Sequence, residues 1–551
     1  MGLTLNLEAL LQDRLAPALE AVAGHPVDPA VRSSPHADFQ SGAALALARE
    51  LGRPPREIAA EVAAKTDLAG VAEIAVSGPG FLNLTVSDSL LTEALRRIAA
   101  DDRLGVPPVA APERVVIDYS GPNVAKEMHV GHLRSTIIGD ALARMLEWLG
   151  HDVIRVNHLG DWGTPFGMLV EHLIDRGGAG DHSIGDLTAF YQAARVKFDT
   201  DDDFRTRARL RVVALQSGDP VSRELWRNLV AQSERYFLDV YARLGVTLGP
   251  DDFAGESGYQ ADLDGIVAEL GEKELLAESD GALCAFPEGF TGRDGAALPL
   301  IVRKADGGYG YAATDLAALR HRIGRLGADR LLYVVGAPQR IHFEMVFAVA
   351  RAAGWLPDGV TAEHIGFGSI LGSDGKMLKT RAGDTIKLAR LLDEAVTRAS
   401  APAVGIGAIK YADLSGDRRG DYVFDWDRML ASTGNTGPYL QYAHARVRSL
   451  FRKAGTGSGT VTVTEPAERD LALVLLGFEP AVTAAAERAE PHRLAVHLHE
   501  LAAAFSVFWE RCPVLRADGA VRASRLGLAA LTARTLQTGM SLLGIEAPEE
   551  I

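Results

Sequence analysis

The segment Arg114-Val115-Val116-Ile117-Asp118-Tyr119, followed by His129-Val130-Gly131-His132, decides the fold of this chain. The first segment is a short, mostly apolar run of the kind found in buried strands. Across residues 130–149 the apolar side chains recur at helical spacing, and residues 152–156 have the pattern of a second strand. A strand, a helix and a strand in this order form a βαβ unit, so we predict a parallel sheet.

The rest of the chain divides where the pattern changes. Residues 1–112 are expected to form a small α/β domain that ends in the Pro-rich linker 106–112, because consecutive prolines continue neither a helix nor a strand. Residues 113–400 carry the βαβ pattern and a charged helical insertion near 181–245, and residues 401–551 show helical periodicity. We therefore predict an α/β fold, with a parallel-sheet domain between a small N-terminal α/β domain and an all-α C-terminal domain.

Hydrophobic patterns also predict individual elements within these domains. Pro17 falls inside the first expected helix and could kink it. Helices are expected over residues 7–22, 39–51 and 526–543, and strands over residues 81–86, 298–302 and 331–335.

The composition is that of a folded globular protein. Of the 551 residues 47% are hydrophobic and 23% charged, and the mean hydropathy is +0.04. No apolar stretch approaches the roughly 20 residues of a membrane span. Cys284 and Cys512 lack the spacing of a disulfide framework or a metal site. We expect a cytoplasmic protein whose own side chains bind no metal ion.

The net charge of −15 disfavours a nucleic-acid partner but does not exclude one. Phosphate binding needs positive charge only on the surface that makes contact. The acidic excess is partly local, at residues 199–203, whereas Arg446, Arg448, Arg452 and Lys453 form a basic cluster. Charge alone therefore leaves the partner open.

His129 and His132 open the predicted helix and lie three residues apart, hence on one face. The free N–H groups at a helix start favour anions, and an imidazole can donate a hydrogen bond to a phosphate oxygen. Gly131 leaves room for a flat base against the backbone. The motif indicates a nucleotide site, although two histidines at a helix start can also serve only as polar caps.

A second segment, Lys376-Met377-Leu378-Lys379-Thr380, follows the flexible approach Gly372-Ser373-Asp374-Gly375. Lysines on such a loop can close over pyrophosphate and stabilise charge that develops in the transition state. An isolated pair of lysines at this spacing is more often part of a solvated loop. Both segments in one chain, in this order, indicate an ATP-dependent adenylating enzyme.

These two segments make the chain resemble the class I aminoacyl-tRNA synthetases, whose HIGH and KMSKS motifs match residues 129–132 and 376–380. Longer stretches narrow the resemblance to the arginyl-tRNA synthetases, and it extends over essentially the whole chain. These stretches are residues 118–128, 160–164, 310–315 and 435–446.

The resemblance implies an arginine–tRNA ligase, which activates L-arginine with ATP and transfers it to the 3′-terminal ribose of tRNA(Arg). Carboxylates suit the guanidinium of arginine because they can pair with it in bidentate geometry. The residues implied for arginine are Asp118, Ser120, Asn123, Tyr311, Asp315 and Gln339. Those implied for ATP are His129, Gly131, His132, Lys376, Met377 and Lys379, of which the histidines and lysines are the catalytic residues. Mg²⁺ would share the work on the phosphates.

The resemblance also implies a Rossmann-like catalytic domain between two tRNA-binding domains, in a monomer. The N-terminal domain would touch the tRNA elbow through Phe81 and Asn83, and the helical domain would bind the anticodon region. Candidate phosphate contacts there are Arg446, Arg448 and Arg452. Phe81 could equally belong to a core, and the arginines to a solvated helix face.

Two alternatives are open at this point. A small-molecule nucleotidyltransferase shares the histidine motif but needs no tRNA, and the separate N-terminal and helical domains argue against it. A non-catalytic tRNA-binding relative is disfavoured by the intact His129, His132, Lys379, Asp118 and Asp315.

The chain departs from the family pattern at a few positions. Gly121 stands where many relatives have serine, Leu378 and Thr380 replace serines of the loop motif, and Pro165 stands where glutamine is common. Both loop lysines are present, so the loop departures do not predict a loss of activity. Gly121 could cost one polar contact near the amino acid, and nothing in the sequence explains Pro165.

Overall fold

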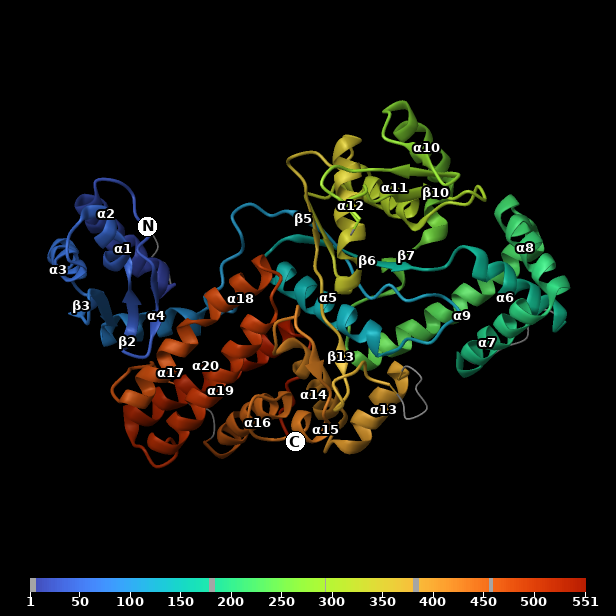
Figure 1. Ribbon diagram of the computed structural model, residues 1–551. Helices are drawn as coiled ribbons and strands as arrows, with labels where there is room; N and C mark the ends of the chain where they lie inside the picture. Colours follow the sequence, from blue (N-terminus) through green and yellow to red (C-terminus); the bar gives the residue numbers. More distant parts are fainter. Residues whose placement is uncertain (1–5, 178–183, 293, 380–385, 455–458) are drawn as a thin grey trace.

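The computed structural model describes residues 6–177, 184–292, 294–379, 386–454 and 459–551 (Figure 1). Within these residues the central sheet has five strands in the order β12–β11–β5–β6–β7, and every neighbouring pair is parallel. The predicted parallel sheet is therefore confirmed. Its strands are β5 (Arg114–Asp118), β6 (Asp152–Leu159), β7 (Phe253–Gly255), β11 (Arg330–Tyr333) and β12 (Thr361–His364).

Helix α5 (Val130–Trp148) connects β5 to β6 and is largely buried. Its close approach to the sheet depends on Gly139, where a Cβ atom would lie 2.3 Å from the Cβ of Tyr119. Because the helix is enclosed by the sheet and by other helices, its first turn has a fixed position at the carboxyl edge of β5.

A smaller antiparallel sheet, in the order β10–β9–β8, lies beside the parallel one. The strand predicted at 298–302 is β10, shifted slightly along the chain, and it pairs with β9 and not with the parallel sheet. Helices α11 and α12 pack against each other near β10 (Figure 1). The elements of this region are η1 (Pro250–Asp252), η2 (Glu256–Asp262), α10 (Leu263–Glu272), β8 (Ala277–Ser279), β9 (Ala282–Ala285), β10 (Leu300–Arg303), α11 (Tyr311–Gly324), η3 (Ala337–Gln339) and α12 (Arg340–Ala352).

The N-terminal unit is an antiparallel sheet in the order β1–β2–β4–β3 with helices packed on it. The helix predicted at 39–51 is wrong in its first part, because Phe39 lies in β2, paired with Leu84 of β4, and the helix begins only after Gly42. Pro17 lies inside α1, which Asn6 caps. The elements are α1 (Leu7–Ala23), β1 (Val31–Ser34), β2 (Ala37–Ser41), α2 (Ala43–Leu51), α3 (Pro55–Lys65), β3 (Ala72–Ser77), β4 (Phe81–Val86) and α4 (Asp88–Ala100).

The last part of the chain is mainly helical and lies between the N-terminal unit and the parallel sheet (Figure 1). Arg469 of α17 forms hydrogen-bonded ion pairs with Asp38 and Asp88 of the N-terminal unit. The elements are β13 (Ile370–Leu371), α13 (Leu388–Arg398), α14 (Pro402–Leu414), β14 (Tyr422–Val423), α15 (Trp426–Met429), α16 (Gly437–Ala454), α17 (Pro466–Leu476), α18 (Phe478–Glu487), α19 (His492–Arg511) and α20 (Gly519–Leu542).

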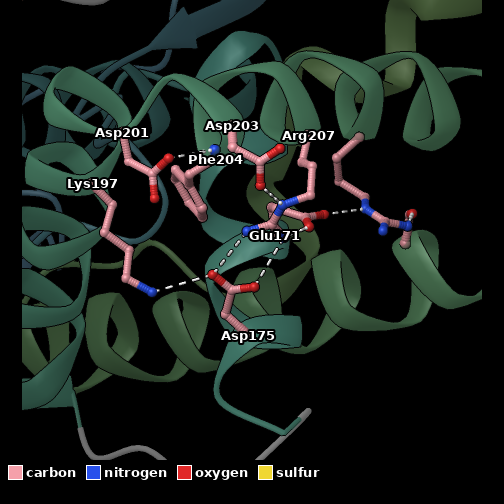
Figure 2. Close-up of polar contacts among 9 residues, drawn as sticks. Glu171, Asp175, Lys197, Asp201, Asp203, Phe204 and Arg207 are labelled. Carbon is pink, nitrogen blue, oxygen red and sulfur yellow. Dashed lines mark hydrogen bonds and ion pairs between the residues drawn. The ribbon is translucent and has the colours of Figure 1, made fainter.

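Between β6 and β7 the chain forms the helices α6 (Thr164–Asp175), α7 (Ile184–Thr200), α8 (Asp202–Ser217) and α9 (Pro220–Leu244), far from the N-terminal unit (Figure 1). An ion-pair cluster joins α6 to α8 (Figure 2). The Arg207 guanidinium lies among Glu171, Asp175 and Asp203. The other oxygen of Glu171 accepts a hydrogen bond from Arg211 Nε at 2.9 Å.

Two of the three carboxylates that pair with Arg207 differ strongly in burial. The side chain of Glu171 is 4% exposed, whereas that of Asp203 is 87% exposed. We predict that Glu171→Ala lowers the free energy of unfolding by about 2 kcal/mol, because it removes a buried carboxylate whose two oxygens pair with the partly exposed guanidinium groups of Arg207 and Arg211. Asp203→Ala, the matched control, should change it by no more than about 0.5 kcal/mol.

Thermal unfolding together with hydrogen exchange of the α6 and α8 amides measures both variants. Equal effects of the two substitutions would show that the buried contacts of Glu171 do not hold the helices together.

Candidate active site

The main cavity opens at the carboxyl edge of the parallel sheet, between β5 and β11. The strand order reverses at this point, and open parallel sheets bind ligands at such positions. The cavity has a volume of about 660 Å³. It brings together these predicted residues: Asp118, Ser120, Asn123, His129, Gly131, His132, Tyr311, Asp315 and Gln339.

A second cavity of about 250 Å³ adjoins the first and shares His129 and Gly131 with it. Met377 and Lys379 line this second cavity. Two adjoining cavities with the start of α5 between them can hold the two halves of a larger ligand.

The imidazole rings of His129 and His132 cap helix α5. His129 is the N-cap residue, and its Nδ1 accepts a hydrogen bond from the backbone N–H of Gly131 at 3.0 Å. The backbone N–H of His129 donates to Nδ1 of His132 at 3.1 Å. The capping role that the sequence left open is therefore real, but it uses only one nitrogen of each ring.

Because each Nδ1 accepts a hydrogen bond, the proton of each neutral ring lies on Nε2. Burial lowers the pKa of His132 to about 3, and the neighbouring His129 adds to the shift. Burial and Lys126 lower the pKa of His129. Both rings are therefore neutral near pH 7, and each has one N–H left to donate to a ligand.

Asp118, at the end of β5, is paired inside the protein. Its Oδ2 lies 2.7 Å from a guanidinium nitrogen of Arg322 on α11, whose side chain is 2% exposed. The Arg322 guanidinium also stacks on the ring of Tyr333, 5.0 Å from its centroid. One carboxylate oxygen of Asp118 thus neutralises a buried arginine, which the sequence did not suggest.

Two further carboxylates lie in the same cavity. Asp315, in the second turn of α11, has its Oδ2 2.6 Å from Nε2 of His342. Glu256 begins η2 directly after β7, and no hydrogen bond or ion pair to its side chain occurs in the part of the chain that the structure describes. Burial, then Asp161 and Asp315, raise the pKa of Glu256 to about 8.

Glu256 was not predicted, because β7 has only three residues and gives no clear strand pattern. The signal that could have found it is its position directly after Phe253-Ala254-Gly255, where a short strand would end at the ligand edge of the sheet. His342 was missed because it lies inside an amphipathic helix, where a histidine is usually structural.

The loop that carries the two lysines forms a tight turn above the second cavity. Leu371 and Met377 form a β-bridge, and Gly375 at the turn has φ 71°. Lys379 lines the cavity, whereas Lys376 is exposed and lines neither cavity. Thr380 lies outside the described residues.

The predicted tRNA contacts lie on the N-terminal sheet and on α16. Phe81 and Asn83 alternate with the buried Leu82 and Leu84 of β4. Phe81 is thus on the outer face of the sheet and not in its core, and Asn83 accepts a hydrogen bond from Gln40 at 2.7 Å.

On α16, Arg446 is exposed. Arg448 pairs with Glu549 at 2.5 Å and Arg452 with Glu550 at 3.4 Å. Two of the three predicted arginines are therefore partly neutralised by the end of the chain.

Among the residues that the structure describes, there is no group of three or more His, Cys, Asp or Glu side chains arranged to hold a metal ion. Among the helices of the described part, none is long and apolar enough to cross a membrane.

Three family profiles match the chain. The profile described as "tRNA synthetases class I (R), catalytic domain" matches residues 95–402. "Arginyl tRNA synthetase N terminal domain" matches residues 6–86, and "DALR anticodon binding domain" matches residues 440–551.

Known proteins resemble the chain over nearly its full length. An arginine–tRNA ligase of Thermobifida fusca is 52% identical, over 99% of each chain. The arginyl-tRNA synthetase structure from Plasmodium falciparum superposes with a TM-score of 0.86 at 27% identity, covering 99% of each chain. That from Thermus thermophilus has a TM-score of 0.81 at 28% identity and covers 99% of this chain and 100% of its own.

Proposed function

The chain belongs to the class I arginyl-tRNA synthetases, and from this premise we propose where arginine and ATP bind in its two cavities. The enzyme activates L-arginine with ATP to arginyl-adenylate and transfers the arginyl group to the 3′-terminal ribose of tRNA(Arg). Similarity over the full length sets aside the alternatives of a small-molecule nucleotidyltransferase and of a non-catalytic relative.

Arginine occupies the main cavity, with its guanidinium at the carboxylates. Asp315 and Glu256 face the cavity with capacity for a cation, whereas Asp118 shares its charge with Arg322. Tyr311, which is 75% exposed, stands at the rim. The observation that carries this assignment is that three carboxylates, Asp118, Asp315 and Glu256, line one cavity at the ligand edge of the sheet, where a guanidinium can pair with them.

The α-amino and carboxylate end of arginine lies toward Asn123, Ser120 and Gln339, at the β5 side of the cavity and in η3. This direction brings the carboxylate close to the start of α5. The α-phosphate of ATP must meet it there, because the carboxylate oxygen attacks that phosphorus and pyrophosphate leaves.

The phosphates of ATP lie at the first turn of α5, between the two cavities. His129 and His132 donate from Nε2, and the helix dipole adds a positive potential. Lys379 and Lys376 on the opposite loop neutralise charge on the departing pyrophosphate. Gly131 and Met377 contact the nucleoside.

Mg²⁺ fits this arrangement as an ion carried by ATP, since the phosphate oxygens are its preferred ligands. The described residues hold no side-chain cluster that would bind it without the nucleotide. When bound, it supplies charge neutralisation on the phosphates.

The tRNA is proposed to lie along the outer face of β4, with Phe81 and Asn83 at its elbow, and along the arginines of α16. Within the described residues Arg446 has no ion-pair partner and can contact a phosphate. Arg448 and Arg452 would have to leave Glu549 and Glu550 before they could do so. In the second step the 2′-OH of the terminal ribose attacks the carbonyl carbon of arginyl-adenylate, the acyl–phosphate bond breaks and AMP leaves. We expect a monomer in the cytoplasm, where its tRNA substrate is found.

Arginine-dependent ATP–pyrophosphate exchange, with and without tRNA(Arg), tests the function. Asp315→Ala should lower kcat/KM for arginine about 100-fold or more, because it removes a charge-assisted partner in a partly buried site. Asp358→Ala, which removes an exposed carboxylate outside both cavities, should behave as wild type. Unchanged arginine kinetics in the Asp315 variant would remove that residue from the site.

Glu256 gives a prediction about pH. Because its pKa is about 8 without ligand and must fall when a guanidinium pairs with it, arginine binding at pH 7.5 should release about three-quarters of a proton. Affinity should rise from pH 6 to 8 and then level off. Calorimetry in two buffers of different ionisation enthalpy measures the proton, and Glu256→Gln is the control that should release none. Equal proton release in both proteins would exclude Glu256.

A further inference from the structure

The chain leaves β5 through two consecutive residues in the left-handed region. Ser120 has φ 74° and Gly121 has φ 54°. For a serine this conformation is uncommon and is kept only where surrounding contacts enforce it. Both residues line the main cavity, so whatever holds this turn also shapes the wall beside the substrate.

Tyr241, near the end of α9, reaches this turn from the helical insertion. Its hydroxyl lies 2.7 Å from Oγ of Ser120 and accepts a hydrogen bond from Nδ2 of Asn157 at 2.8 Å. Tyr241 is 1% exposed, and Asn157 on β6 is fully buried. Oδ1 of Asn157 accepts a hydrogen bond from the backbone N–H of Gly121 at 2.9 Å. Tyr241 and Asn157 together therefore contact both residues of the turn.

The directions of these hydrogen bonds follow from one another. The Gly121 N–H can only donate, which places Oδ1 of Asn157 toward it and Nδ2 toward Tyr241. The Tyr241 hydroxyl therefore accepts from Asn157. Ser120 is its only other partner in the described part of the chain, so Tyr241 donates its own proton to Ser120 Oγ.

The proton of Ser120 is then left for another acceptor. Oγ1 of Thr136 lies 3.0 Å away and itself donates to the carbonyl oxygen of His132 at 2.7 Å. Without a substrate, the Ser120 hydroxyl can donate a hydrogen bond to Oγ1 of Thr136. With a substrate in the cavity, Ser120 can donate to it instead.

We propose that Tyr241 is a positioning residue that holds the Ser120–Gly121 turn in its left-handed form and orients the Ser120 hydroxyl as a donor to the α-carboxylate of arginine. The carboxylate follows from chemistry, because it is the only hydrogen-bond acceptor in arginine at neutral pH. This inference rests on the proposed binding of arginine in the main cavity.

Helix α9, which carries Tyr241, contacts the loop between β5 and α5 at a second place. Ser233, two turns earlier on α9, accepts a hydrogen bond from the backbone N–H of Ala125 at 2.9 Å, and Ala125 is also left-handed, with φ 61°. Helix α9 therefore contacts both places in the loop between β5 and α5 where the backbone is left-handed, the Ser120–Gly121 turn and Ala125. A movement of the insertion would be transmitted to the amino-acid side of the cavity.

The test compares Tyr241→Phe, Ser120→Ala and the double variant by aminoacylation kinetics. Tyr241→Phe keeps the ring and removes only the hydroxyl, and should raise KM for arginine about tenfold with KM for ATP unchanged. Ser120→Ala should have a similar effect, and the double variant should be no worse than either single one, because Tyr241 acts through Ser120.

Agmatine, the decarboxylated analogue of arginine, identifies the group that Ser120 contacts. Its inhibition constant should be the same for wild type and Tyr241→Phe, because agmatine has no carboxylate with which Ser120 could form a hydrogen bond. Tyr411→Phe is the matched control: its hydroxyl is also buried, beside Asn435 and the carbonyl of Ala495, but in the helical domain. It should lower thermal stability to a similar degree and leave KM for arginine unchanged.

Three results would overturn the inference. They are an unchanged KM for arginine in Tyr241→Phe, an equal loss of agmatine inhibition, and additive effects in the double variant. A higher KM for ATP alone would assign Ser120 to the nucleotide and also contradict it. Failure of the proposed arginine site would look different, since Asp315→Ala would then also leave KM for arginine unchanged.

Discussion

The first turn of α5 is closed by two imidazole rings, and the chemistry of both cavities depends on the kind of cap that they provide. A serine or aspartate at a helix start would satisfy the same N–H groups, but aspartate would direct negative charge at an approaching phosphate. Each imidazole accepts a backbone hydrogen bond at Nδ1 and keeps Nε2–H as a donor. His129 and His132 therefore stabilise the helix and keep a donor for a triphosphate, and burial lowers the pKa of both rings, which favours their neutral forms.

Buried charges hold α5 to the parts of the chain that are expected to meet tRNA. Arg134, two residues after the histidine motif, pairs with Asp413 of the helical region at 3.2 Å, and both side chains are at most 2% exposed. Further along α5, Asp140 bonds to Arg144, and beside it the fully buried Lys410 donates to the carbonyl oxygen of Leu244 at the end of α9. Removing one partner of such a pair is costly. The insertion and the helical domain are thus fixed to the helix whose first turn is proposed to bind the phosphates.

The sequence predicted the parallel sheet because an apolar strand, a long helix and a second strand are a local pattern, and the motif residues followed from their place on it. It did not predict features that depend on distant contacts. Residues 39–41 pair with β4 far along the chain, so helical spacing there was misleading. Arg322 could not be matched to Asp118 before the fold brought α11 to β5. Glu256 follows a strand too short to recognise, and its raised pKa arises only from burial in the assembled cavity.

The central claim is that one continuous site holds the guanidinium at the sheet edge and the phosphate at the start of α5. A crystal structure with a non-hydrolysable arginyl-adenylate analogue tests it most directly. The account predicts the guanidinium between Asp315 and Glu256 and the phosphate mimic within hydrogen-bond distance of Nε2 of His129 and His132. A guanidinium outside this cavity, or a phosphate mimic contacted by neither histidine, would contradict it.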